Sequence, residues 1–311
     1  MSEFHHVSVL LEECIQGLNI RPDGIYVDGT LGGAGHSSRI AAELTTGRLI
    51  GIDRDPVALK AAGERLAPYS DRVTLVHSNF CEIAKVLDDL GIDAVDGILL
   101  DLGVSSPQLD DGSRGFSYMT DARLDMRMDS GDALTAETIV NTWSYEELRR
   151  ILFDYGEERY APQIAAAICR RREQQPIQTT LELVDVIRSA MPAQALREKQ
   201  HPAKRSFQAI RIAVNDELGA VRKVMDAAIP RLKQGGRLAI ITFHSLEDRI
   251  VKNGMADAAK GCTCPPSFPV CVCGKKPQVK LITRKPVVSG DEELEFNPRA
   301  RSAKLRICEK M

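Results

Sequence analysis

The first hundred residues alternate between short apolar runs and longer amphipathic stretches. Runs rich in β-branched residues, each short enough for a buried parallel strand, occur at 25–27, 49–52, 73–76 and 95–100. Helical periodicity separates them at 37–44 and 56–66, where Pro56 suits a first helical turn after Asp55 as the N-cap. This alternation predicts βαβ units and a parallel sheet.

Beyond Asp101 the strand pattern gives way to helical periodicity. Amphipathic stretches at 144–153, 161–172 and 180–190 predict an inserted all-helical domain. Strand-like runs return at 237–243, 279–283 and 303–307. We therefore expect an α/β protein with boundaries at 1–107, 108–203 and 204–311, in which the helical domain interrupts the sheet domain. We expect mobility only at 289–295.

Composition places the chain among ordinary globular proteins. Of its 311 residues, 43% are hydrophobic and 27% charged, and the length favours more than one domain. No apolar run approaches the roughly 18 residues that span a bilayer, and the first residues lack a signal-peptide pattern, so we expect a cytoplasmic protein with no membrane partner. The formal charge of −2 argues against a globally basic nucleic-acid binder, although residues 275–311 hold an excess of Lys and Arg.

A glycine-rich segment, residues 28–36, follows the first predicted strand and runs into a helix. Backbone amides at such a turn can approach a nucleotide without obstruction by side chains. If Gly33 and Gly35 are the first glycines of a dinucleotide fingerprint, Ser38 occupies the third position, which argues against a hydride-transfer enzyme. A structural tight turn is the alternative, but glycines this dense after a buried strand favour a ligand.

Polar and aromatic residues stand at the tips of three other predicted strands. Asp53 can accept hydrogen bonds from ribose hydroxyls or cap the next helix, and we weigh these roles equally. Phe80 can flank an adenine ring or belong to the core. His244 can hydrogen-bond a base or collect a proton, and a capping or core role is the even alternative.

The fourth strand ends in Asp101 and leads to Ser105, Ser106 and Pro107. The exocyclic amine of a base is a poor nucleophile, so a site that alkylates it must accept its hydrogens and hold its nitrogen in line with the electrophile. The Asp101 carboxylate, the two serine hydroxyls and the carbonyls before Pro107 are suitable acceptors. This segment is similar to the (Asp/Asn/Ser)-Pro-Pro-aromatic motif of amino-methyltransferases, with the prolines and the aromatic residue displaced.

Most of the chain resembles the bacterial cytosine-N4 methyltransferases of small-subunit ribosomal RNA, the MraW/RsmH family. The segments that carry the resemblance are 28–36, 101–111, 114–117, 124–128, 205–218, 243–249 and 297–302. The resemblance implies a Rossmann-like S-adenosylmethionine-dependent methyltransferase sheet with an inserted helical domain for substrate recognition. It also implies N4-methylation of a cytidine in the decoding centre of 16S ribosomal RNA, with the small-subunit RNA or the assembled 30S particle as partner and no DNA.

The resemblance also assigns site residues by motif position. It implies cofactor contacts from Ala34, Gly35, His36, Asp53, Phe80, Asp101 and Gln108. Ala34 departs from the glycine that is frequent in the family, and its methyl group is tolerable if the contact is through the backbone. For catalysis we expect Asp101, Ser105 and Ser106 to accept the hydrogens of the amine, and the proton to leave to solvent or to His244.

Two other functions remain open at this stage. A DNA amino-methyltransferase would share the glycine-rich segment but would accept naked duplex DNA. A ribosome-assembly factor that binds RNA without catalysis would need no cofactor, so titration with S-adenosylmethionine separates it from both enzymes.

The cysteines raise a separate question about metal. Eight are too few for a disulfide scaffold in a chain of this length. Cys262, Cys264, Cys271 and Cys273 nevertheless form a C-x-C-x6-C-x-C pattern in a Pro-rich loop. Such thiolates can bind zinc tetrahedrally, but the spacing is tighter than the usual C-x2-C. The sequence is thus compatible with a structural zinc but does not predict one.

Overall fold

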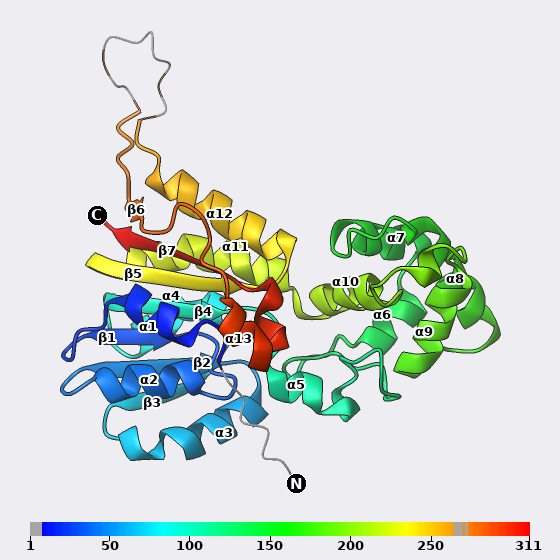
Figure 1. Cartoon of the computed structure of the whole chain (residues 1–311), viewed down its shortest axis with the longest axis horizontal. Coiled ribbons are helices and arrows are strands. Elements are labelled where there is room, and N and C mark those ends of the chain that lie inside the picture. The colour runs from blue at the N-terminus through cyan, green and yellow to red at the C-terminus, as the bar shows by residue number, and fades with distance from the viewer. Residues whose placement is uncertain (1–7, 263, 265–269, 271–272) are drawn as a thin grey trace. The chain divides into compact units, whose positions relative to one another are not determined.

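The computed structural model describes residues 8–262, 264, 270 and 273–311, and it divides into two compact units (Figure 1). An α/β unit combines Met1–Gly103 with Leu218–Met311. A helical unit comprises Val104–Glu217. The predicted fold class, an α/β sheet with an inserted all-helical domain, is confirmed.

A seven-stranded sheet in the order β3-β2-β1-β4-β5-β7-β6 forms the centre of the α/β unit. Its strands are β1 (Ile25–Asp28), β2 (Arg48–Asp53), β3 (Val73–His77), β4 (Val95–Asp101), β5 (Leu232–Thr242), β6 (Val279–Leu281) and β7 (Lys304–Lys310). The first five strands in this order run parallel, and β7 runs antiparallel to both β5 and β6. Each predicted strand is present within a few residues of its expected bounds. The order reverses direction between β1 and β4, which is where a Rossmann-like sheet places a ligand crevice.

Helices cover both faces of this sheet because its central strands are apolar on both sides. One face packs against α1 (Leu11–Leu18), α2 (Gly35–Glu43) and α3 (Pro56–Leu66). The other packs against α4 (Ile83–Asp89), α11 (Glu217–Ala228) and α12 (Ser245–Ala259). Alternation along β4 divides its residues, with Leu99 in one core and Leu100 in the other. The Asp55 side chain caps α3 by accepting the Val57 amide, as predicted.

Short elements complete the α/β unit. They are η1 (Ala67–Tyr69), η2 (Phe80–Glu82), η5 (Ile229–Arg231), α13 (Asp291–Phe296) and η6 (Pro298–Ser302). The stretch 289–295, for which we expected mobility, instead contains α13. Its Glu293 carboxylate accepts the Leu10 amide at 3.0 Å, a long-range contact that local composition does not reveal. Within the described residues, no helix is both long and apolar enough to cross a membrane.

The helical unit has a core of its own. Its elements are α5 (Ser106–Asp110), η3 (Gly112–Arg114), α6 (Ala136–Thr142), α7 (Tyr145–Asp154), α8 (Ala161–Gln174), α9 (Thr180–Ser189), η4 (Ala195–Arg197) and α10 (Lys204–Asn215). Capping boxes begin α7 and α9, where Ser144 pairs with Glu147 and Thr179 with Glu182.

The boundaries of the compact units differ from those expected at 107/108 and 203/204. The helical unit starts at Val104 and continues through α10 to Glu217. The reason is the apolar stripe of α10, because Phe207, Ile210 and Val214 are buried in the helical core. The periodicity of α10 identified a buried face but not the core that covers it.

Candidate active site

The topology gathers the carboxyl ends of β1, β2, β4 and β5 along one edge of the sheet. Asp28 ends β1, Asp53 ends β2 and Asp101 ends β4, while His244 follows β5. Neighbouring strands are in register there, with Asp28 opposite Leu99 and Asp101 opposite Ile241. Ligands of open parallel sheets bind at this edge. Three predicted site residues, Asp53, Asp101 and His244, therefore lie on one edge of one sheet.

Asp28 fixes the start of the glycine-rich segment. Its Oδ1 accepts the Thr30 amide at 3.1 Å, and its Oδ2 accepts the Ser37 hydroxyl at 2.6 Å. The residue is only 1% exposed, and burial raises the pKa of its carboxyl group to about 7. Because Ser37 belongs to α2, this carboxyl group ties the end of β1 to the first turn of the next helix.

Asp53 holds the middle of the same segment. Its Oδ2 accepts the Gly32 amide at 2.9 Å, and its Oδ1 accepts the Asp55 amide at 2.8 Å. Burial raises the pKa of Asp53. Each carboxylate oxygen has a second lone pair, so hydroxyl groups of a ligand can still be accepted. The residue that caps α3 is Asp55 and not Asp53.

Ala34 and Gly35 close the segment under two different constraints. Ala34 is fully buried and has φ +56°, the left-handed region in which glycine is normally favoured. A Cβ on Gly35 would lie 1.9 Å from the Ser8 hydroxyl oxygen, so a larger residue there would require Ser8 to shift. Glycine would adopt this left-handed backbone at position 34 without strain.

His36 links this segment to β4. Its Nε2 lies 3.0 Å from the Val9 carbonyl oxygen, which can only accept, so Nε2 carries the hydrogen. The other nitrogen, Nδ1, lies 3.9 Å from Asp101 Oδ2. The imidazole thus faces the Asp101 carboxyl group with Nδ1.

Asp101 ends β4, between β1 and β5, at the carboxyl edge of the sheet. Its backbone amide donates to Thr30 Oγ1 at 2.6 Å, which positions the carboxyl group beside the glycine-rich segment. Its Oδ1 is buried and has no hydrogen-bond partner among the described residues, although the side chain as a whole is 25% exposed. Burial, followed by the nearby Asp28 and Glu247 carboxylates, raises the pKa of Asp101 to about 8. An unpaired acid in this setting is ready for a cationic or hydrogen-donating ligand.

His244 precedes the first turn of α12. Its Nε2 lies 3.2 Å from Glu247 Oε1, and within the described part of the chain its Nδ1 has no hydrogen-bond partner. The other oxygen of Glu247 accepts the Phe243 amide at 3.0 Å. Glu247 is buried, so it both fixes the helix start and orients the imidazole.

Phe80 begins η2 after the third strand, where the Asn79 side chain accepts the Cys81 amide at 3.1 Å. A Cβ on Gly29 would lie 3.1 Å from Phe80 Cβ and 2.4 Å from a methyl group of Leu100. The ring is half-buried and also packs against the sheet core. Phe80 therefore lies beside the start of the glycine-rich segment, and both of its predicted roles remain open.

Ser105, Ser106 and Gln108 belong to the helical unit. The Ser105 hydroxyl accepts the Gln108 amide at 3.4 Å, and Gln108 Oε1 accepts the Ser105 amide at 3.0 Å, a capping box that begins α5. The Ser106 side chain lies outside the described part of the structure. The contacts of Ser105 and Gln108 are thus local ones that shape the turn after β4.

Sequence reasoning missed three residues that build this edge. Thr30 supplies the acceptor for Asp101, Asp28 anchors the segment, and Glu247 lies against His244. A signal existed for Glu247, because an acid three residues into a helix commonly reaches back to the amides before it. None existed for the pairing of Thr30 with Asp101, which joins two separate strands.

Comparison with known proteins identifies the family. A family model described as the MraW methylase family matches residues 3–311. The chain belongs to this family. A relative from Brevibacillus brevis named ribosomal RNA small subunit methyltransferase H is 61% identical, covering 99% of this chain and 98% of its own. A relative of the same name from Heliobacterium modesticaldum is 58% identical and covers 99% of both chains. The resemblance in the MraW-family motifs is thereby confirmed along the whole chain.

Proposed function

We propose that this MraW-family protein transfers a methyl group from S-adenosylmethionine to N4 of a cytidine in the decoding centre of 16S ribosomal RNA. The observation that carries the proposal is Asp101, whose buried Oδ1 has no hydrogen-bond partner among the described residues, next to a glycine-rich segment at the carboxyl edge of the sheet. Acids gathered at one edge suit a ligand that is itself a cation. When bound, S-adenosylmethionine supplies a methyl group already activated by the positive charge on its sulfur.

The residues proposed to hold the cofactor follow from their contacts. Asp53 has lone pairs left for the two ribose hydroxyls, and Phe80, beside the start of the glycine-rich segment, would flank the adenine. Ala34, Gly35 and His36 contribute through the first turn of α2, where backbone amides point out of the helix. Gln108 is retained as a proposed contact from α5.

The substrate assignment rests on the relatives and on the chemistry of the amine. Both relatives carry the name ribosomal RNA small subunit methyltransferase H. An amine with a delocalised lone pair must be oriented, and Asp101 with the turn at Ser105 and Ser106 supplies acceptors for its hydrogens. Positioning should contribute more than acid-base chemistry. The imidazole of His244 then takes the proton after transfer, or solvent does.

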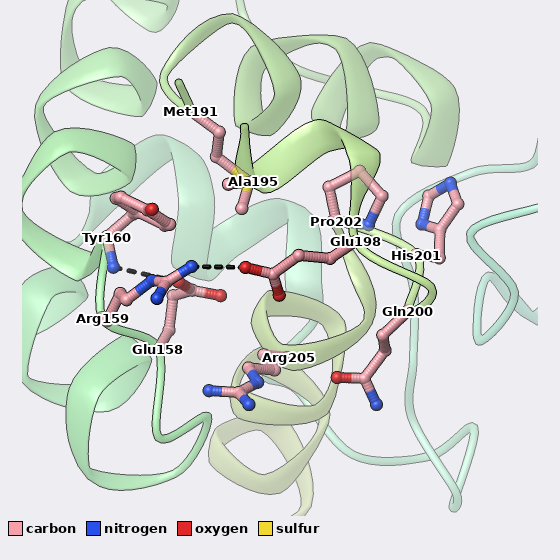
Figure 2. Close-up of a pocket in the computed structure, with 10 residues that line it drawn as sticks. All are labelled: Glu158, Arg159, Tyr160, Met191, Ala195, Glu198, Gln200, His201, Pro202 and Arg205. Atoms are coloured by element: carbon pink, nitrogen blue, oxygen red, sulfur yellow. Dashed lines mark hydrogen bonds and ion pairs between the residues drawn. The ribbon is translucent and has the colours of Figure 1, made fainter. Parts of the chain in front are cut away.

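We propose that the helical unit recognises the RNA, either as free small-subunit RNA or within the 30S particle. A pocket of about 110 Å³ lies wholly within this unit (Figure 2). Its lining is Glu158, Arg159, Tyr160, Met191, Ala195, Glu198, Gln200, His201, Pro202 and Arg205. The Arg159 guanidinium lies 4.8 Å from the centre of the Tyr160 ring, and the His201 ring stacks on Tyr118. Guanidinium and aromatic groups are the side chains that single-stranded RNA recognition uses.

The test combines label transfer with mapping. The protein is incubated with methyl-labelled S-adenosylmethionine and with small subunits lacking the mark, alongside naked 16S RNA and duplex DNA. We expect label only in RNA, at N4 of one decoding-centre cytidine, and much slower labelling with Asp101→Ala. Label in DNA would favour the DNA amino-methyltransferase. Failure to bind S-adenosylmethionine in calorimetric titration would favour the non-catalytic assembly factor.

A further inference from the structure

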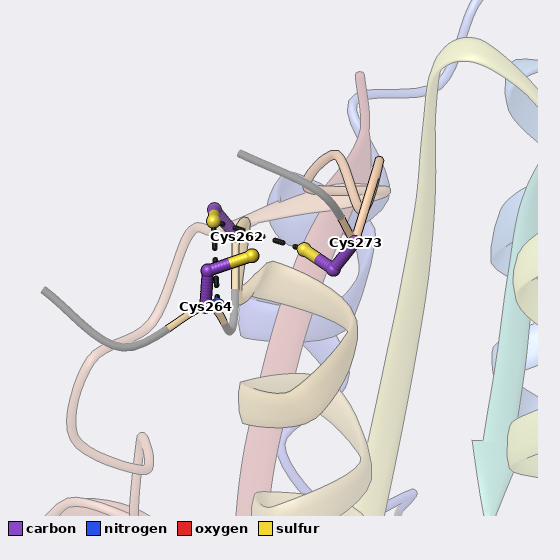
Figure 3. Close-up of side chains that lie close together, drawn as sticks. All are labelled: Cys262, Cys264 and Cys273. Carbon is purple, nitrogen blue, oxygen red and sulfur yellow. Dashed lines mark hydrogen bonds between the residues drawn. The ribbon is translucent and has the colours of Figure 1, made fainter. Parts of the chain in front are cut away.

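A second cluster of chemically active side chains lies in the loop between α12 and β6. Cys262, Cys264 and Cys273 point toward one another there, and their sulfur atoms all lie within 4.8 Å of each other (Figure 3). The Cys262 and Cys273 sulfurs are 3.7 Å apart. Eleven positions separate these two residues in the sequence, so the chain must fold back to bring them together.

The base of the loop is closed by contacts outside the cysteines. The Gln278 amide donates to the Ala258 carbonyl at 2.8 Å, and Lys275 Nζ donates to the Asp257 carbonyl at 3.2 Å. These bonds join the last turn of α12 to the residues before β6. The two ends of the segment that carries the cysteines are therefore joined to each other next to α12 and β6.

Backbone details favour convergence of the sulfurs. The Cys264 amide donates to Cys262 Sγ at 3.4 Å, the kind of outer contact that orients a thiolate ligand. Gly274, directly after Cys273, has φ +63° and open space where a Cβ would lie. Its glycine is therefore required by the left-handed turn and not by packing.

We propose that Cys262, Cys264 and Cys273 are thiolate ligands of a structural Zn²⁺ ion. Two thiolates on a tetrahedral zinc, each with a Zn–S bond of about 2.3 Å, have sulfurs about 3.8 Å apart. The 3.7 Å between Cys262 and Cys273 matches this spacing and is far from the roughly 2.05 Å of a disulfide. Binding releases one proton from each thiol that becomes a ligand. Cys271 lies outside the described residues, and the proposal rests on the other three cysteines.

The position of the cluster indicates a structural role. Helix α12 starts at the carboxyl end of β5 and runs back along the sheet, as Figure 1 shows. The loop after it meets the chain terminus, where the Met311 amide donates to Gln278 and Val279 pairs with Lys310. The cysteines thus lie toward the edge opposite Asp101. A metal held by these cysteines would link the residues after α12 to those before β6, and methyl transfer needs none there.

The test measures metal in the full-length protein, purified without chelator under reducing conditions. We expect about one zinc per chain by mass spectrometry of the metal, and less than a tenth of that in Cys262→Ser and Cys273→Ser. The matched control Cys169→Ser, in α8 of the helical unit, should keep the wild-type zinc content. Affinity for S-adenosylmethionine should change less than threefold in Cys262→Ser, which separates this site from the cofactor site.

Two results would overturn the proposal. One is a zinc content near zero that does not rise on titration with Zn²⁺. The other is a native mass two hydrogens below that of the reduced chain, with Cys262 and Cys273 recovered in one cross-linked peptide, because those thiols would then form a disulfide. Replacement by Co²⁺ gives a positive check, since thiolate ligation produces intense near-ultraviolet absorption that both serine variants should lose.

Discussion

Strand β4 carries one aspartate near each end, and the two have different surroundings. Asp96 accepts the Ile25 amide at 2.7 Å and Lys233 Nζ at 2.9 Å, and it pairs with Arg21. Although burial acts to raise it, these partners hold the pKa of Asp96 below its ordinary value. Asp101 has one carboxylate oxygen without a partner among the described residues, and its pKa is raised to about 8.

The difference separates a structural acid from a functional one. A buried carboxylate normally has a cation or several donors, because an unpaired one is strongly destabilising. The fold provides both at Asp96, whereas at Asp101 the described residues leave Oδ1 without a hydrogen-bond partner. An acid left unpaired at the ligand edge of a sheet is best explained by a partner that arrives with the ligand.

The largest predicted effect is on the rate of methyl transfer, and it tests the difference between Asp101 and Asp96. Asp101→Ala should lower the single-turnover rate about 10²- to 10³-fold, because it removes the group proposed to orient the amine. Asp96→Ala, assayed where both variants are folded, should stay within about threefold of wild type. The contrast fails if Asp101→Ala keeps a near-normal rate on unmodified small subunits.

The converse prediction concerns stability. Asp96→Ala removes the acceptor of the Ile25 amide and two ion pairs with half-exposed cations, which water can then solvate. We expect a loss of about 1–3 kcal/mol in the free energy of unfolding, measured by urea denaturation. Asp101→Asn, which replaces a carboxyl group whose Oδ1 has no hydrogen-bond partner among the described residues, should not destabilise the protein. A stability loss in Asp101→Asn equal to that in Asp96→Ala would remove the distinction.

The raised pKa of Asp101 predicts a dependence of stability on pH. Its folded-state pKa, about 8, lies above the unfolded value of roughly 4. Its stabilising contribution is therefore complete below about pH 4 and is lost as pH rises through about 8. Between pH 6 and 8, wild type without cofactor should lose on the order of 2 kcal/mol more stability than Asp101→Asn.

Titration with the cofactor at several pH values also tests the raised pKa of Asp101. Affinity for S-adenosylmethionine should rise between pH 6 and 8, because the sulfonium favours the ionised carboxylate. Affinity for S-adenosylhomocysteine, whose sulfur is neutral, should rise less. Parallel pH profiles for the two ligands would show that Asp101 does not face the sulfonium.

The strands and the glycine-rich segment were easier to predict from the sequence than the difference between Asp96 and Asp101. The strands were recognisable because buried parallel strands are continuous apolar runs, and the segment at 28–36 because glycines cluster after the first of them. Asp101 was singled out at the end of its strand, but the surroundings of Asp96 and Asp101 were not predicted, since their partners lie on distant segments. Arg21 and Lys233 are far from Asp96 in the sequence, and no local pattern links either of them to it.

Three larger features were also mispredicted or left undecided because they depend on distant segments of the chain. The apolar stripe of α10 was visible, but its core was not, so the boundary was expected too early. The acid-rich α13 was taken for a mobile stretch because its contact with Leu10 spans nearly the whole chain. The cysteine spacing was ambiguous until the fold brought three sulfurs together. Each of these features depends on contacts between distant segments.

The smallest predicted effect concerns His244, at the same edge as Asp101. His244→Ala should lower the single-turnover rate by about tenfold or less, because solvent can take the proton once the methyl group has moved. Glu247→Gln, which can still accept the Phe243 amide, is the matched control for the start of α12. If His244→Ala is more damaging than Asp101→Ala, acid-base chemistry outweighs orientation of the amine, and Asp101 is then not the dominant group at this edge.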